Sequence, residues 1–201
     1  MKTRDIWFAS DHHMMHTNII KFTNAKGDIS RTRRGVPFSS IEEHDEYLID
    51  QHNSVVKAQD KVYFLGDFCI NQKGLKLAPR FNGSKRLVRG NHDIFNTTEY
   101  LNAGFKEVYG VRVFTPKELG GHFAVASHVP LHPSTLYRWD YNIHGHTHGN
   151  RVEYAPGLPD LRYISACMEQ LDDYKPLHID EIINWLNFLE DSQGVFGFET
   201  P

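Results

Sequence analysis

The chain has 201 residues, a hydrophobic fraction of 40% and a formal net charge of −3. This length and hydrophobicity suffice for a buried core and exclude a disordered protein. The nearly balanced charge disfavours a protein that depends on non-specific attraction to nucleic acid. Thirteen histidines exceed the roughly four or five that an average composition would supply. We therefore expect one domain over residues 1–201 whose excess imidazoles have a chemical use.

The first residues of the chain and its two cysteines indicate the cellular compartment of the protein. No apolar run approaches the roughly 18–20 residues of a membrane span. The apolar stretch before Asp11 is too short for a secretory signal. Cys69 and Cys167 lie far apart in the sequence, which favours two small buried side chains in a reducing compartment over a disulfide. We expect a cytoplasmic protein without a membrane partner, and the oligomeric state stays open.

In chain order, the first predicted element is a strand that ends in a polar loop, and the pattern recurs four times. Runs this short and rich in β-formers are typical of buried strands. In open α/β sheets, ligand-binding groups gather on loops at the carboxyl ends of the strands. All five loops here carry Asp, Asn or His. The five runs are 6–9, 61–65, 85–88, 123–126 and 141–143.

Between these strands lie other elements. The polar segment 22–38 lacks periodicity and is a candidate surface loop or lid. Ser40 and Glu43 form a capping-box pattern that predicts a helix to about residue 53. Residues 111–114 and 122–127, joined across two glycines, predict a hairpin. A final helix begins near Asp180, with apolar residues on one face.

The loop residues together predict a metal site. Imidazole, carboxylate and amide oxygen are ligands for Mn, Fe, Zn, Ni or Co. In an extended turn, alternate side chains lie on the same side of the backbone. The pairs Asp11/His13 and His146/His148, each separated by one residue, should therefore present two donors together. Two such pairs and one bridging carboxylate are enough for a two-metal site. The candidate residues are Asp11, His13, Asp67, Asn91, His92, His128, His146 and His148.

These motifs, taken in order, resemble those of the calcineurin-like metallophosphoesterase superfamily. The resemblance spans residues 6–148, and the tail at 173–177 is similar to that of small bacterial and phage members. It implies an α/β fold of two packed mixed β-sheets flanked by helices, a four-layer sandwich with metals at one edge. The motifs are Asp11-x-His13, Gly66-Asp67, Gly90-Asn91-His92-Asp93, His128 and Gly145-His146-x-His148.

The resemblance also implies roles for these residues. Asp11, His13 and His148 would bind a first metal, and Asn91, His128 and His146 would bind a second. Asp67 would bridge the two, and His92 would face the leaving group as the general acid. The implied cofactors are two divalent transition-metal ions, manganese foremost, with Fe, Zn, Ni and Co open.

The implied reaction is hydrolysis of a phosphomonoester or phosphodiester by in-line attack of a hydroxide that bridges the metals. Two divalent ions and two carboxylates leave a pocket charge of about +2, which suits a phosphate anion. The chain has little length for a docking domain, so we expect a small or nucleotide-like substrate.

One departure from the superfamily concerns the residues after Asp67. The protein-phosphatase branch continues with an acidic residue and an arginine, whereas Phe68-Cys69-Ile70-Asn71 follow here. This disfavours a Ser/Thr protein phosphatase and leaves the residue that orients His92 unassigned. Asp93 is adjacent to His92, but neighbouring side chains usually point elsewhere.

Substrate contacts are predicted from nearby polar residues. His16, Arg89 and Asn91 are candidates for binding the phosphate ester. Arg31, Arg33 and Arg34 are candidates for recognising a polyanion. They support one alternative function, a metal-dependent nuclease on DNA or RNA. A second alternative is a non-enzymatic scaffold of the same fold. We interpret His12 and His144 as structural.

Overall fold

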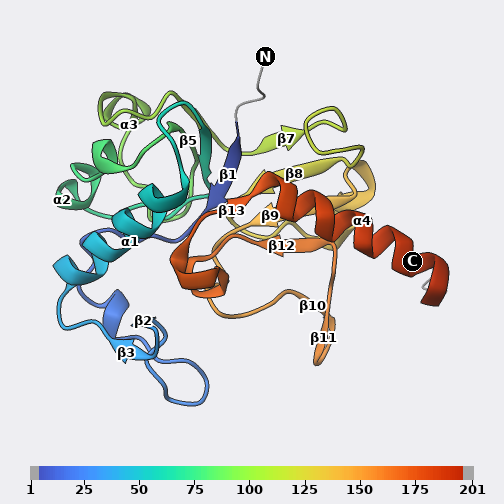
Figure 1. Ribbon diagram of the computed structural model, residues 1–201, viewed down its shortest axis with the longest axis horizontal. Helices are drawn as coiled ribbons and strands as arrows, with labels where there is room; N and C mark the ends of the chain where they lie inside the picture. Colours follow the sequence, from blue (N-terminus) through green and yellow to red (C-terminus); the bar gives the residue numbers. More distant parts are fainter. Residues whose placement is uncertain (1–4, 197–201) are drawn as a thin grey trace.

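A computed structural model describes residues 5–196, and its main strands form two mixed sheets (Figure 1). The first has the order β13-β1-β4-β5-β6, with β13 antiparallel to β1 and the other pairs parallel. Its strands are β1 (Ile6–Ala9), β4 (Lys61–Phe64), β5 (Ser84–Val88), β6 (Glu107–Tyr109) and β13 (Leu177–His178).

The second sheet has the order β12-β9-β8-β7, with only β7 antiparallel to its neighbour. All five predicted strands are therefore present, and the predicted hairpin is the β7–β8 pair. Two small hairpins, β2–β3 and β10–β11, lie outside both sheets. The bounds are β7 (Arg112–Phe114), β8 (Ala124–Ser127), β9 (Tyr141–His144), β12 (Tyr163–Ser165), β2 (Thr32–Arg33), β3 (Val36–Pro37), β10 (Glu153–Ala155) and β11 (Leu158–Pro159).

The helices are α1 (Ile41–Val55), α2 (Gln72–Leu75), α3 (Thr97–Asn102) and α4 (Ile179–Phe196), with 3-10 turns η1 (Ile19–Lys21), η2 (Ala78–Arg80), η3 (Pro133–Arg138), η4 (Met168–Gln170) and η5 (Asp172–Tyr174). Within residues 5–196, no helix combines the length and apolar character needed to cross a membrane.

The predicted cap of α1 is half correct. The Ser40 hydroxyl accepts a hydrogen bond from the Glu43 amide, as expected of an N-cap. The Glu43 carboxylate, however, binds the amide and hydroxyl of Ser39 instead of the Ser40 amide. Ser39 offers two donors to one carboxylate oxygen, and this satisfies the charge better than a single amide does.

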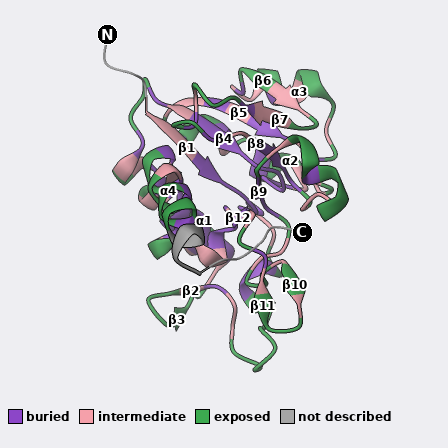
Figure 2. Cartoon of the chain, turned by 90° about the vertical axis from the view of Figure 1, so that its right-hand side faces the viewer, coloured by how far each residue is buried: buried purple, intermediate pink, exposed green. Residues whose placement is uncertain are grey.

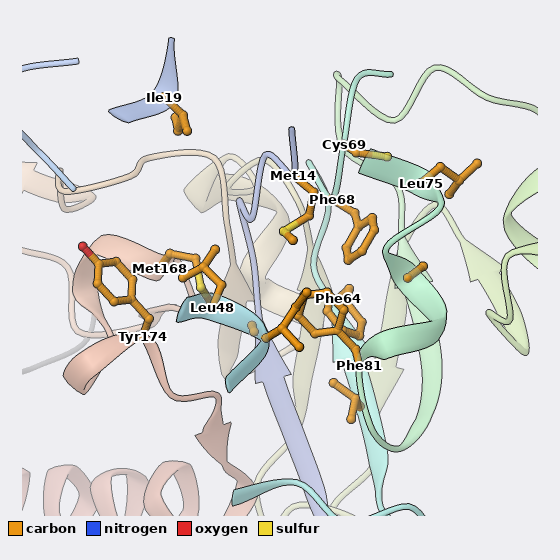
Figure 3. Close-up of a cluster of buried hydrophobic side chains, with 14 of the residues drawn as sticks. Met14, Ile19, Leu48, Phe64, Phe68, Cys69, Leu75, Phe81, Met168 and Tyr174 are labelled. Carbon is orange, nitrogen blue, oxygen red and sulfur yellow. The ribbon is translucent and has the colours of Figure 1, made fainter. Parts of the chain in front are cut away.

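The core has two parts because successive residues of a strand point to opposite faces. Phe64 points into the cluster that packs under α1, with Met14, Phe68 and Phe81 around it (Figure 3). Its neighbour Tyr63 points into the other cluster, which lies between the sheets.

The cluster between the sheets also holds Phe8 from β1, Ile143 from β9, and Ile182 and Leu186 from α4. Each fully buried side chain of this size contributes about 1.5–3 kcal/mol. Two mixed sheets packed together and flanked by helices confirm the predicted fold. Cys69 and Cys167 are buried and unpaired, also as predicted.

Candidate metal centre

The predicted ligands meet at one edge of the sandwich because the strands before them are parallel within each sheet. Asp11, Asp67 and Asn91 follow β1, β4 and β5 of the first sheet. His128 and the pair His146 and His148 follow β8 and β9 of the second. The strands β1, β4 and β9 are largely buried, purple in Figure 2, whereas the loops after the strands reach the surface at Asn91 and His146. Two groups form there that could each hold a metal ion.

The first group is Asp11, His13 and His148. Oδ2 of Asp11 accepts hydrogen bonds from the His146 amide at 2.9 Å and the Cys167 thiol at 3.3 Å. This fixes the carboxylate so that Oδ1 faces the imidazoles. Nε2 of His13 and Nε2 of His148 each lie 3.8 Å from Oδ1.

The donor atoms of this group fit a divalent ion. Asp11 Oδ1 and His13 Nε2 are buried, and no hydrogen-bond partner for either lies among the described residues. Their separation of 3.8 Å is too long for a hydrogen bond. Two ligands of one ion, each about 2.0–2.2 Å from it, lie roughly 3–4 Å apart.

His13 also has the protonation state that a ligand requires. Burial, together with the nearby Arg31 guanidinium, lowers the pKa of His13 to about 2. The imidazole is therefore neutral near pH 7 and has a free lone pair. A metal ligand must be deprotonated in this way.

The second group is Asp67, His128 and His146. Nδ1 of His128 donates to the Leu65 carbonyl at 2.8 Å, which leaves Nε2 as the lone-pair nitrogen. That Nε2 lies 3.4 Å from Asp67 Oδ1 and 3.3 Å from His146 Nδ1. Asn91 adds a fourth donor, since its Oδ1 lies 3.1 Å from the same nitrogen.

Asp67 lies between the two groups. Its Oδ1 is near His128, whereas its Oδ2 is 3.7 Å from Nε2 of His13. Burial pushes the pKa of Asp67 upward, but the hydrogen bond and charge of protonated His128, with the His92 amide, outweigh it. The resulting pKa is about 2, so the carboxylate is charged at neutral pH. A metal ion on Nε2 of His128 would take the place of the His128 proton. Its two oxygens are placed to serve one ion each.

The backbone at the centre is unusual. Nine non-glycine residues among those described have positive φ, and five of them are predicted ligands. This corrects one step of the sequence argument, because the x-spaced pairs do not lie on extended backbone. Left-handed turns bring their side chains together instead, and such conformations concentrate at functional sites. The five are Asp11 (61°), His13 (50°), Asp67 (52°), His146 (71°) and His148 (50°).

Two glycines allow the loops to approach this closely. A Cβ added to Gly90 would lie 2.2 Å from Asp67 Oδ1, and one added to Gly145 would lie 1.9 Å from Ser10 Oγ. Any side chain at either position would displace Asp67 or the loop that carries Asp11. The two motif glycines are therefore required by contact between loops.

Glu169 and Arg31 are residues of the centre that sequence reasoning missed. Oε1 of Glu169 lies 2.8 Å from Nδ1 of His148 and 2.8 Å from Nε of Arg31. Arg31 is fully buried and also donates to the carbonyls of Asp11 and His12. It therefore cannot bind a polyanion, which corrects its predicted role. The polar residues around Arg31 in the sequence do not indicate that its side chain is buried.

His92 lies at the exposed side of the centre. Its side chain is 45% exposed, and Nε2 is 3.9 Å from Asp67 Oδ2. Asp93 does not orient it, because the Asp93 carboxylate accepts from the amides of Asp67, Phe68 and Gly90. Asp93 instead holds together the two loops that carry Asp67 and Asn91.

The other predicted substrate contacts are placed as follows. The ring of His16 lies 5.7 Å from that of His13, beside the first group. Arg89 donates to the carbonyls of Asp93 and Phe95 in its own loop. Arg34 is 79% exposed and pairs with Asp173.

The two histidines interpreted as structural, His12 and His144, are both buried. His12 is buried and packs against Phe64, Phe68 and Phe81. His144 is also buried, and its Nδ1 lies 2.8 Å from the Gly145 carbonyl.

Sequence comparison shows the family of this chain. It is 32% identical over 188 residues to the uncharacterized protein MJ1445 of Methanocaldococcus jannaschii, covering 91% of this chain and 92% of that protein. The gene 66 protein of Mycobacterium phage L5 is 32% identical over 174 residues, covering 73% and 78%. The chain belongs to this family. No protein-family profile matches it.

One solved structure shares the fold over most of this chain. A protein of unknown function from Aquifex aeolicus, AQ665, superposes with a TM-score of 0.64 at 26% identity, covering 90% of this chain and 99% of that one. An archaeal phosphodiesterase gives a TM-score of 0.42 at 19% identity, covering 80% and 82%.

Proposed function

We propose that this protein hydrolyses phosphate esters with two divalent transition-metal ions, manganese foremost. The observation that supports this most strongly is the pair of ligand groups that share Asp67. One carboxylate with an oxygen toward each group matches a two-ion site, and the unpartnered Asp11 Oδ1 and His13 Nε2 match bound cations. The ions, when bound, supply positive charge for the phosphate and make the attacking water acidic.

The protein groups divide the remaining work. With two divalent ions bound, the two carboxylates of Asp11 and Asp67 would leave a net charge of about +2, which suits an anionic ester. His92 is partly exposed and beside Asp67, where it can protonate the departing alkoxide oxygen as the P–O bond breaks. His16, Arg89 and Asn91 are proposed phosphate contacts. Asn91 would also bind the second ion.

The nuclease alternative has less support than the phosphoesterase. It relied on the segment 31–34, in which Arg31 is buried and Arg34 is paired with Asp173. The guanidinium of Arg33 lies 5.0 Å from the centre of the Tyr47 ring. The segment therefore offers a nucleic-acid backbone less positive charge than its three arginines suggest.

The test is a substrate screen with the Mn²⁺-loaded protein. We expect hydrolysis of aryl phosphate mono- or diesters and of nucleotides, and loss of that activity in Asp67→Asn. Short oligonucleotides form a separate arm, where cleavage with a steep salt dependence would favour the nuclease. Failure to hydrolyse any ester with Mn, Fe, Zn, Ni or Co would reject the proposal.

A further inference from the structure

A cavity of about 550 Å³ lies beside the first metal group, a size typical of small-molecule sites. One wall is the segment 19–30, with Ile19, Phe22 and Ile29, and the other is the loop after β9, with His148 and Gly149. His148 belongs to both the wall and the metal group. A phosphate held at the centre would thus have its esterified group at the cavity mouth.

The charge of the wall limits what can enter. None of the described residues that line the cavity is Lys or Arg, so a second phosphate would find no counter-ion. The one charged carboxylate, Glu169, is already paired with Arg31 and His148. The cavity therefore suits an uncharged group.

The apolar part of the wall favours a flat group. Phe22 is 51% exposed although it lines the cavity, so its ring is available to a ligand. The His16 ring packs edge-on to it, with centroids 6.1 Å apart, and lies 5.7 Å from the His13 ring. This aromatic path leads from the cavity to the metal group. Aromatic side chains in such positions bind bases by stacking.

The polar part of the wall supplies a few fixed groups. Asn24 uses its side-chain oxygen within its own turn, where it accepts from the amides of Lys26 and Asp28. Thr23, Ser30 and Asn150 are further polar residues of the lining. The wall is thus an even mix of polar and apolar surface, in which the rings can stack on a heterocycle and the polar groups can hydrogen-bond its edge.

We propose that this cavity binds the base of a nucleoside phosphate and so selects the substrate of the metal centre. The inference rests on the proposed phosphoesterase function for its biological meaning. Its first test is independent of hydrolysis, because it uses a ligand without phosphate. Adenosine is titrated into the Mn²⁺-loaded and the metal-free protein by calorimetry, with ribose as the comparison ligand.

Two variants test the wall. Phe22→Ala should weaken adenosine binding about 10-fold, because the base loses its stacking contact with the ring. Phe188→Ala, which removes an equally exposed aromatic ring on α4 outside the cavity, should bind like the wild type. Gly149→Leu should weaken binding at least about 10-fold, because Gly149 lines the cavity and an added Cβ meets no atom within 4 Å, so the larger side chain has room to occupy it. Gly110→Leu is its control, at a similarly open position outside the cavity lining.

Each outcome decides the assignment. Adenosine binding that falls in Phe22→Ala and Gly149→Leu but not in the controls supports it. No adenosine binding, equal binding of ribose, or unchanged binding in both wall variants overturns it. Hydrolysis of aryl phosphates without adenosine binding rejects the cavity assignment alone. Adenosine binding without hydrolysis of any ester rejects the phosphoesterase function and leaves a nucleoside site.

Discussion

Nδ1 of His148 lies 2.8 Å from Oε1 of Glu169, a residue 21 positions later in the chain. Burial raises the pKa of Glu169, but Arg31 and the bond to His148 outweigh it and hold the pKa far below its usual range. The charged carboxylate therefore accepts the Nδ1 proton of His148. This leaves the Nε2 lone pair facing Asp11, the orientation that a metal ligand needs.

Removing the charge of Glu169 should weaken metal binding. For Glu169→Gln we expect an affinity for the first metal lower by about 10- to 100-fold, because the imidazole loses its anionic partner. Calorimetric titration with Mn²⁺ measures this. Glu42→Gln, at an exposed acid of α1, is the matched control. An unchanged affinity in Glu169→Gln would contradict the assigned role.

Arg31 should be important for stability, whereas Arg34 should not. Arg31→Met leaves Glu169 buried without its cation, and breaking a buried pair in this way costs about 3–5 kcal/mol. Arg34→Met removes an exposed pair and should change the free energy of unfolding by less than about 1 kcal/mol. Urea unfolding of the two variants compares them directly. Equal, small effects would show that Arg31 is not structurally required.

His92 should matter most when the leaving group is poor. His92→Asn removes a proton donor, so alkyl esters should slow far more than activated aryl esters, whose leaving groups need no proton. Rates for a series of esters with increasing leaving-group pKa measure this. His132→Asn, at an exposed histidine bonded to Ser134, is the control. An equal loss across the series would remove His92 from the role of general acid.

Acid should destabilise the fold through His52. Burial lowers the pKa of His52 to about 4, although its bond to the Asn82 carbonyl opposes the shift. Between that value and the unfolded value of about 6.5, the unfolded chain binds a proton that the folded chain does not. Stability is therefore lost as the pH falls from about 6.5 toward 4, by about 2 kcal/mol at pH 5.

The measurement is urea unfolding at pH 7 and pH 5 in the wild type and in His52→Gln. The glutamine variant will be less stable at both values, but its loss between them should be smaller by about 2 kcal/mol. The same loss in both proteins would mean that other groups cause the acid sensitivity.

The strands and their polar loops were predictable because the information is local. Runs such as 61–65 have a composition that favours a buried strand, and their parallel arrangement puts the following Asp67 at a common edge. The cap at Ser40 and the β7–β8 hairpin depend on neighbouring residues in the same way. The types and order of the candidate ligands were likewise visible in the chain.

Only the tertiary structure decided which residues support the candidate metal ligands. Glu169 reaches His148, and Arg31 reaches Glu169 across 138 positions, through packing that no local pattern encodes. The same is true of Phe22 and Gly149, which line one cavity although 127 positions (149 − 22) separate them in the chain. The sequence by itself determined the chemistry of the candidate ligands, because that depends on residue type. Their orientation, protonation and neighbouring cavity depend on burial and distance, which exist only once the chain has folded.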